Sequence, residues 1–164
     1  MAKIISLPCT EHVKDIYIQA IVGTRQFFCF VNRATDPAVK QQWIRTGLLD
    51  ENYADSLLIR INNTQEGETF NFSLDEMIQI ITAIDICSKF YLNPIFIKVE
   101  KAICNMFPDL TPEQMKAGNN YMLKCFQSMI TELKTLMKGN VKFKKAISQL
   151  NKIEITDFKM PSDN

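Results

Sequence analysis

The segment from Ser73 to Leu92 constrains the fold of this chain more than any other stretch. Ser73 and Glu76 have the spacing of a capping box, in which each side chain bonds the backbone N–H of the other residue, so a helix is predicted to begin here. Apolar side chains nearly encircle that helix and leave only a narrow polar stripe. Because a helix that is apolar on most sides must be buried, we expect other elements to pack around it. The apolar positions are Leu74, Met77, Ile78, Ile80, Ile81, Ile84, Ile86 and Phe90.

The residues that precede this helix show patterns typical of strands. A Gly-Thr pair separates two runs of β-branched and aromatic residues, 16–22 and 25–31. Glycine in the first central position suits a type II′ turn, and the composition of both runs favours strands. We therefore expect a β-hairpin. A helix beginning at Glu11, with Thr10 as its cap, is the alternative.

A second hairpin is predicted from Leu57 to Phe72, because both ends of this segment alternate and the polar loop between them contains Gly67. Residues 3–7 predict an outer strand that Pro8 ends. Between the hairpins, an Asp-Pro pair is typical of a helix start and indicates a short helix near 37–46.

The second half of the chain has the period of helices. An Asn-Pro pair predicts a helix over residues 94–107, and Thr111 with the glutamine three residues later forms a second capping box. The long helix that follows is predicted to end at Gly139. Val141 to Lys152 indicates a basic amphipathic helix.

These elements predict an α+β fold in one domain, residues 1–153. An antiparallel sheet of two hairpins, with an N-terminal strand and a short crossover helix, is followed by a C-terminal helical bundle that packs on the sheet. Residues 1–72 are expected to be mainly strands, apart from the helix near 37–46, and residues 73–153 helical, with a polar tail over 154–164. A chain of 164 residues is long enough for one hydrophobic core.

Composition and cysteine usage exclude several classes of protein. The five cysteines are an odd number without a C-x-x-C pair, and the first residues carry no apolar run of signal-peptide length, so we expect reduced thiols in a cytoplasm. No segment has the roughly 20 apolar residues of a membrane helix. Cys9 and His12 have the spacing of half a zinc site, but no second pair completes it. We expect no metal, no cofactor and no small-molecule substrate.

Three aromatic residues of the first predicted hairpin form one candidate site. Strand alternation places Tyr17, Phe28 and Phe30 on a common face. Such a face can stack nucleic-acid bases or contact a partner protein. The plainer interpretation is that these side chains pack beneath a helix.

Lysines form a second candidate site. The net charge of +1 divides into −3 over residues 1–110 and +4 over residues 111–164. No acidic residue lies between Leu133 and Ile153. Lysines can contact phosphate groups without reading bases, and the alternative is a solvated helix face. The candidate phosphate contacts are Lys134, Lys138, Lys142, Lys144, Lys145 and Lys152.

Methionines form the third candidate site. Met115, Met122 and Met129 recur every seven residues along the long C-terminal helix. Methionine adapts to irregular partners, so this face is a candidate for contact with a partner helix. A seam in the protein's own core is the simpler interpretation.

The functional expectation follows from the amount of apolar surface that the predicted elements must bury. A hairpin that is apolar on both faces and a helix that is apolar on most sides exceed what a two-layer domain buries by itself. We therefore expect a non-enzymatic structural or interaction subunit of a homo- or hetero-oligomeric assembly. A viral or phage particle is a home compatible with the small size and the Ile-, Lys- and Asn-rich composition. The alternative is a single-stranded nucleic-acid-binding protein that uses the aromatic sheet face and the lysines.

Overall fold

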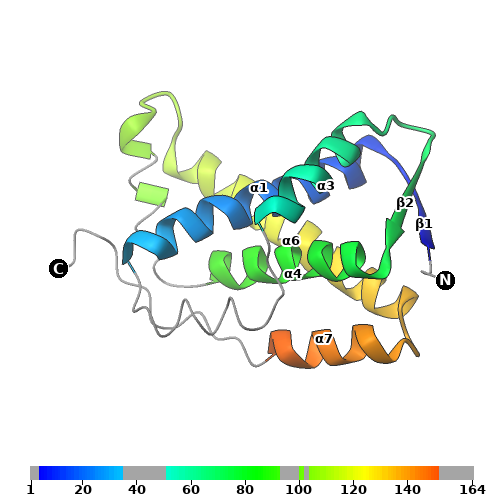
Figure 1. The fold of residues 1–164 in the computed structure, drawn as a ribbon. Helices are drawn as coiled ribbons and strands as arrows, with labels where there is room; N and C mark the ends of the chain where they lie inside the picture. Colours follow the sequence, from blue (N-terminus) through cyan, green and yellow to red (C-terminus); the bar gives the residue numbers. More distant parts are fainter. Residues whose placement is uncertain (1–3, 35–50, 93–99, 102–103, 152–164) are drawn as a thin grey trace.

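The computed structural model describes residues 4–34, 51–92, 100–101 and 104–151 (Figure 1). Helices dominate, and two strands form a small antiparallel sheet, so the predicted mixture of helix and sheet is confirmed. The elements in chain order are β1 (Ile4–Pro8), α1 (Glu11–Ala34), α3 (Glu51–Asn63), β2 (Thr69–Ser73), α4 (Leu74–Leu92), α6 (Pro112–Leu136) and α7 (Val141–Asn151).

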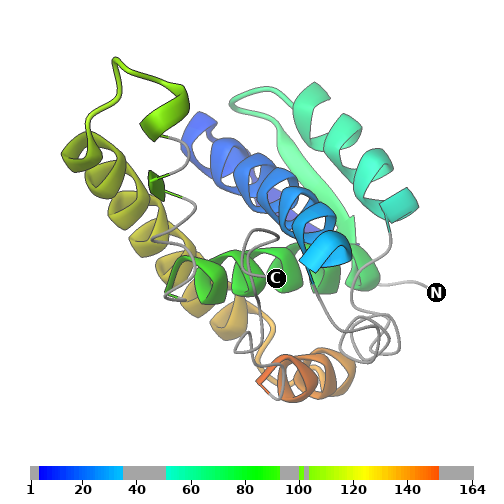
Figure 2. The ribbon, with the colours of Figure 1, turned by 90° about the vertical axis from the view of Figure 1, so that its left-hand side faces the viewer.

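Helix α4 is the centre of the molecule, as its apolar circumference predicts. It contacts α1, α6, α7 and both strands. Figures 1 and 2 show α1 along one side of α4 and α7 along another. Ile80, Ile84 and Ile86 are completely buried. Thr82, on the polar side of this helix, is buried too and donates to the carbonyl of Ile78 over 2.6 Å.

The predicted capping box at the start of α4 is confirmed. The Ser73 N–H donates to Glu76 Oε1 over 2.9 Å, and the Glu76 N–H donates to Ser73 Oγ over 3.1 Å. A second capping box joins Thr111 and Gln114 at the start of α6. Gly139 follows α6 with a φ of 93°, a conformation that favours glycine.

The first predicted hairpin is wrong, because residues 11–34 form helix α1. Thr10 begins this helix, accepting the Val13 N–H on its hydroxyl over 3.1 Å. The buried residues Ile16, Tyr17 and Ala20 follow the helical spacing of three and four, and they pack against the core. The same sequence fits a strand period locally. Packing of one helical face against α4 decides between the two structures.

The second predicted hairpin is also wrong, although one of its strands exists. Its first half ends helix α3, where Leu57 and Ile61 are buried four residues apart. Its second half is β2, which pairs antiparallel with β1. The predicted outer strand at residues 3–7 is therefore largely confirmed, and β2 is its partner. Since α1 and α3 replace the hairpins, residues 1–72 are not mainly strands.

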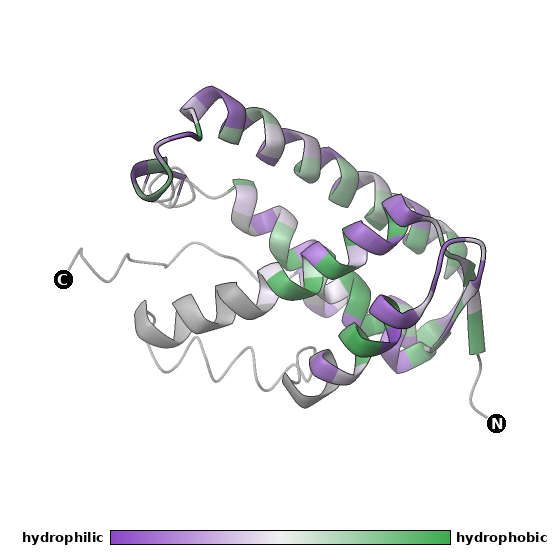
Figure 3. Ribbon diagram, turned by 90° about the horizontal axis from the view of Figure 1, so that it is seen from above, coloured by the Kyte–Doolittle hydropathy of each residue, from purple (hydrophilic) through white to green (hydrophobic). Residues whose placement is uncertain are grey.

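Two aromatic rings of the sheet and one of α1 pack together in the core. The inner face of the sheet holds Phe70 and Phe72, with ring centroids 5.3 Å apart and planes 16° from parallel. Tyr17 of α1 lies against both rings, at 5.6 Å from Phe70 and 6.1 Å from Phe72. Figure 3 shows apolar positions on the facing sides of the helices. On the outer sheet face, Ser6 Oγ donates to Asn71 Oδ1 over 2.8 Å.

The C-terminal half agrees with its predicted elements where it is described. A helix is predicted over residues 94–107. Where the structure describes this segment, residues 100–101 and 104–106 are helical. Helix α7 matches the predicted basic helix, and α4 packs on both strands. The predicted helix near 37–46 and the tail at 154–164 lie outside the described residues. In the described part of the chain, no helix has both the length and the apolar character to span a membrane.

Candidate interaction site

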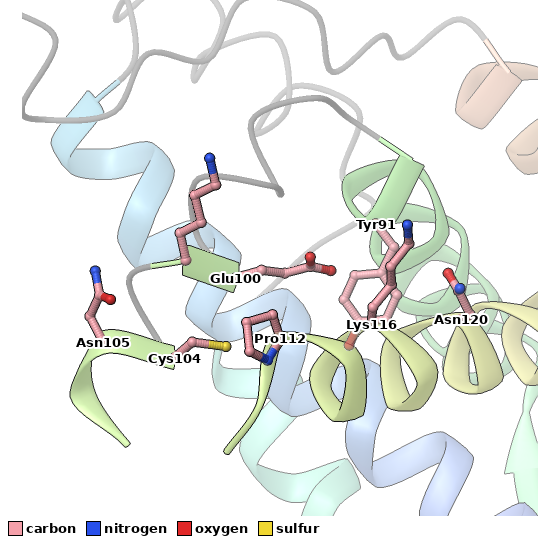
Figure 4. A pocket seen from close by; sticks show the side chains of 8 residues that line it. Tyr91, Glu100, Cys104, Asn105, Pro112, Lys116 and Asn120 are labelled. Atoms are coloured by element: carbon pink, nitrogen blue, oxygen red, sulfur yellow. The ribbon is translucent and has the colours of Figure 1, made fainter. Parts of the chain in front are cut away.

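A pocket of about 500 Å³ lies where α4 ends and α6 begins (Figure 4). Three segments form it: the end of α4, the helical residues 100–105 so far as they are described, and the first turns of α6. Its described lining consists of Tyr91, Glu100, Lys101, Cys104, Asn105, Pro112, Lys116 and Asn120.

Tyr91 forms the α4 side of the pocket. Its ring lies 5.8 Å from that of Phe126, a completely buried residue of α6. Burial, with a smaller contribution from Cys87, raises the pKa of Tyr91 to about 12. The phenol is therefore neutral at physiological pH, and this wall offers an aromatic surface with one polar group.

Glu100 is fixed across the pocket. Asn119 Nδ2 of α6 donates to Glu100 Oε1 over 2.8 Å, which ties the short helical segment to α6. Figure 4 shows Glu100 extending toward Tyr91 and Lys116. With Lys101, the described lining therefore carries two ammonium groups and one hydrogen-bonded carboxylate.

Four large exposed apolar side chains are close in sequence to residues that line this pocket. We call Leu92, Met106, Phe107 and Tyr121 the apolar rim; their exposed fractions are 63%, 73%, 56% and 59%. Leu92 directly follows a lining residue of the pocket, as do Met106 and Tyr121, and Phe107 comes next after Met106. The pocket and the exposed apolar side chains therefore come from the same three segments of the chain.

The predicted aromatic site does not exist as a sheet face. Tyr17 is 2% exposed and packs against Phe70 and Phe72. Burial raises the pKa of Tyr17, and the negative charge of Glu132 adds to this. Phe28 and Phe30 lie in α1, where residues two apart do not share a face. Their side chains lie outside the described part of the structure.

The predicted lysine site lies on the surface. Lys134 is on α6, Lys138 follows it, and α7 carries the next three, all with exposed side chains. Lys142 is paired with Asp75 of α4, with 2.6 Å between Nζ and Oδ1. Because both partners are more than 60% exposed, this pair adds little stability. Lys152 lies outside the described residues.

The predicted methionine face contributes to the protein's own core. Met129 is 6% exposed, Met122 packs against the core, and Met115 is partly buried. Helix α4 contacts α6 directly. The methionines at seven-residue spacing thus pack mostly within the chain itself.

Cys9 and His12, which have the spacing of half a zinc site, differ in exposure. Cys9 is buried, and its thiol donates to the Thr64 carbonyl over 3.8 Å, whereas His12 is exposed on the first turn of α1. Among the described residues, no three potential metal-ligating side chains come together.

Sequence reasoning did not identify the pocket or the rim. Tyr91, Glu100 and Lys116 come from three segments, and only the packing of α6 on α4 brings them together. One signal was available: Met106 and Phe107 are large apolar residues beside Pro108, at a predicted helix end where exposure is common.

Comparisons of the chain with family models, with curated proteins and with solved structures gave no match.

Proposed function

We propose that this protein is a non-enzymatic interaction subunit that binds a protein partner through the apolar rim and the pocket beside it. The observation that carries the proposal is that four apolar residues, each more than half exposed, lie within two residues of the pocket lining in the sequence: Leu92, Met106, Phe107 and Tyr121. Exposed apolar side chains that gather beside polar groups are typical of protein interaction surfaces.

The composition of this surface supports a protein partner. Aromatic residues and methionine are enriched at protein interfaces, and binding energy concentrates where a side chain enters a pocket. The rim supplies two aromatic residues and one methionine. A pocket of about 500 Å³ has room for one or two anchor side chains of a partner.

The charges of the pocket indicate which kind of side chain the partner supplies there. Lys101 and Lys116 line it, and the only described carboxylate in the lining, Glu100, already accepts a hydrogen bond from Asn119. A carboxylate of the partner would complement the two ammonium groups. We therefore propose a segment in which an apolar anchor residue stands beside an aspartate or glutamate.

The pocket offers less support for catalysis. Cys104 is a nucleophile by type, but no hydrogen bond or ion pair joins it to another described side chain. Nucleophilic catalysis requires a base or cation that activates the thiol. His12 is on α1 beside the sheet and is not part of the described lining.

The experiment is a selection from a displayed library of random peptides on the immobilised protein. We expect enriched peptides to share an apolar residue next to an acidic one. Their binding should be lost in Phe107→Ser and Met106→Ser, and it should persist in Ile59→Ser, a matched control in which an exposed apolar residue of α3 is changed. Failure to enrich any peptide, or equal loss in Ile59→Ser, contradicts the proposal.

A second candidate function rests on the lysines. Lys134, Lys138, Lys144 and Lys145 are exposed around the α6–α7 turn, in a stretch without acidic residues. This surface is suited to non-specific contact with a polyanion, although the stacking residue Tyr17 is buried. The test is fluorescence anisotropy with a labelled single-stranded oligonucleotide. Binding that weakens with salt and with Lys144→Glu and Lys145→Glu supports this candidate, and no binding at low salt removes it.

A further inference from the structure

The two-stranded sheet has two outer edges, one on β1 and one on β2. They differ in whether side chains cover their backbone N–H and C=O groups. Within the described residues, β1 and β2 pair only with each other. Figure 1 shows β1 at the margin of the molecule, at the opposite end from the start of α6. The backbone groups of an unpaired strand edge are a template for another strand unless the protein covers them.

The register identifies the backbone groups of β1 that point away from β2. The Cys9 N–H donates to the Glu68 carbonyl over 2.9 Å, just beyond the Pro8–Thr69 pair. Hydrogen-bonded pairs alternate along an antiparallel ladder, so Leu7 and Ile5 also bond β2. The residues between them direct their N–H and C=O groups outward.

Those outward residues are Ile4, Ser6 and Pro8, and all three side chains are exposed. Pro8 has no N–H, which limits how far a neighbouring strand can extend. No hydrogen bond within the described residues occupies the backbone of Ser6, whose hydroxyl alone is bonded, to Asn71. Two residues of β1, Ile4 and Ser6, therefore present unpaired donors and acceptors.

The outer edge of β2, by contrast, is closed by side chains. Arg60 of α3 donates to the Asn71 carbonyl and pairs with Glu76. Glu76 in turn accepts the Ser73 N–H over 2.9 Å. The guanidinium also lies 6.0 Å from the centre of the Phe72 ring. Among the residues that the structure describes, side chains therefore cover the edge of β2, and nothing covers the edge of β1.

We propose that the open edge of β1 pairs antiparallel with β1 of a second copy of this chain, around a two-fold axis at Ile5. Ile4 of each copy then lies opposite Ser6 of the other, and each pair exchanges two hydrogen bonds. The result is a four-stranded sheet in the order β2, β1, β1, β2. This surface is distinct from the apolar rim and does not depend on its function.

Self-complementarity and charge favour a second copy as the occupant. A two-fold interface requires one patch to fit itself, and two outward residues placed symmetrically about Ile5 meet this requirement. The exposed side chains along the sheet are uncharged: Ile4, Ser6, Pro8, Thr69 and Asn71. Edge strands that avoid pairing usually carry charges, so the lack of any here lets two copies approach. Because the contact is short, we expect weak dimers with a dissociation constant between micromolar and millimolar.

The test compares Ser6→Pro with Ser6→Ala by sedimentation equilibrium of the full chain up to millimolar concentration. Both variants lose the hydroxyl bond to Asn71, but only proline removes the outward N–H, and neither touches a backbone hydrogen bond between β1 and β2. We expect the wild-type protein and Ser6→Ala to dimerise similarly and Ser6→Pro to dimerise at least about tenfold more weakly, since two bonds are lost. Circular dichroism checks that each variant is folded.

Three results overturn the proposal: a wild-type protein that stays monomeric at the highest concentration, a dimer that persists unchanged in Ser6→Pro, and equal loss in both variants. Hydrogen exchange on the wild-type protein gives a second readout that needs no variant. The amide of Ser6 should exchange more slowly as concentration rises, whereas exchange that is independent of concentration contradicts the pairing.

Discussion

At the scale of single residues, one close contact fixes how α1 crosses α4. Gly23 lies where an added Cβ would come within 3.0 Å of Cys87 Sγ. That thiol donates to the Ala20 carbonyl over 3.2 Å, and the neighbouring Thr24 hydroxyl donates to the Ala83 carbonyl over 3.1 Å. The glycine that resembled a turn residue in the sequence is thus a site of close helix packing.

Gly23→Ala is expected to destabilise the protein, although alanine favours a helix. The helix gains roughly 1 kcal/mol, but overpacking in a tight core costs about 1–3 kcal/mol, so we expect a net loss of about 1 kcal/mol in the free energy of unfolding. Gly118→Ala is the matched control, since an added Cβ in α6 meets nothing within 4 Å, and it should stabilise by about 1 kcal/mol. Urea denaturation measures both. Equal gains in the two variants contradict the contact, and Cys87→Ala should abolish the penalty at Gly23.

The same thiol makes stability depend on alkaline pH. Burial raises the pKa of Cys87 from 9.0 to about 11, although the hydrogen bond with Thr24 opposes this. Between these values the thiol of the unfolded chain ionises while the folded one stays protonated. The unfolded state then binds fewer protons, and stability falls as pH rises. We expect a loss on the order of 2 kcal/mol between pH 9 and pH 11 in reducing buffer, and a flatter profile in Cys87→Ala. Identical pH profiles for the two proteins contradict the assignment.

At the scale of elements, the capping boxes of α4 and α6 are expected to contribute unequally to the stability of the fold. Ser73 connects β2 directly to α4, and its cap is half-buried beside the Arg60–Glu76 pair. Thr111 caps α6 at an exposed position. The first cap therefore orders a junction between sheet and core, whereas the second orders a helix end in solvent.

This difference predicts unequal costs for the same change. We expect Ser73→Ala to lower the free energy of unfolding by about 1.5 kcal/mol and Thr111→Ala by about 0.5 kcal/mol, the upper and lower parts of the range for helix caps. Chemical denaturation of the two variants measures the difference. A larger effect at Thr111 than at Ser73 contradicts this account of the junction.

What the sequence could predict about these elements depends on how local the signal is. The capping boxes at Ser73 and Thr111 and the burial of α4 are local patterns, and the structure confirms them. Residues 16–31 fit both a strand period and a helix period, so packing against α4 had to decide. The pocket was not predictable, because Tyr91 and Lys116 line it together only when α6 packs on α4.

At the scale of the whole molecule, α4 is covered by segments of its own chain. Helices α1, α6 and α7 and the small sheet surround it. The apolar circumference that suggested a partner in the sequence therefore supports folding of this chain. The two surfaces for which we propose protein partners are the apolar rim and the open edge of β1.

The most direct test of the central claim is hydrogen exchange of the protein in complex with a selected peptide. We predict slower exchange for amides of residues 104–121 and around Leu92, which carry the rim and the pocket, and unchanged exchange in β1 and α7. Phe107→Ser should remove the protection, and Ile59→Ser should not. Protection confined to α7, β1 or α3, with none around Met106 and Phe107, would contradict the claim that the rim binds a protein partner.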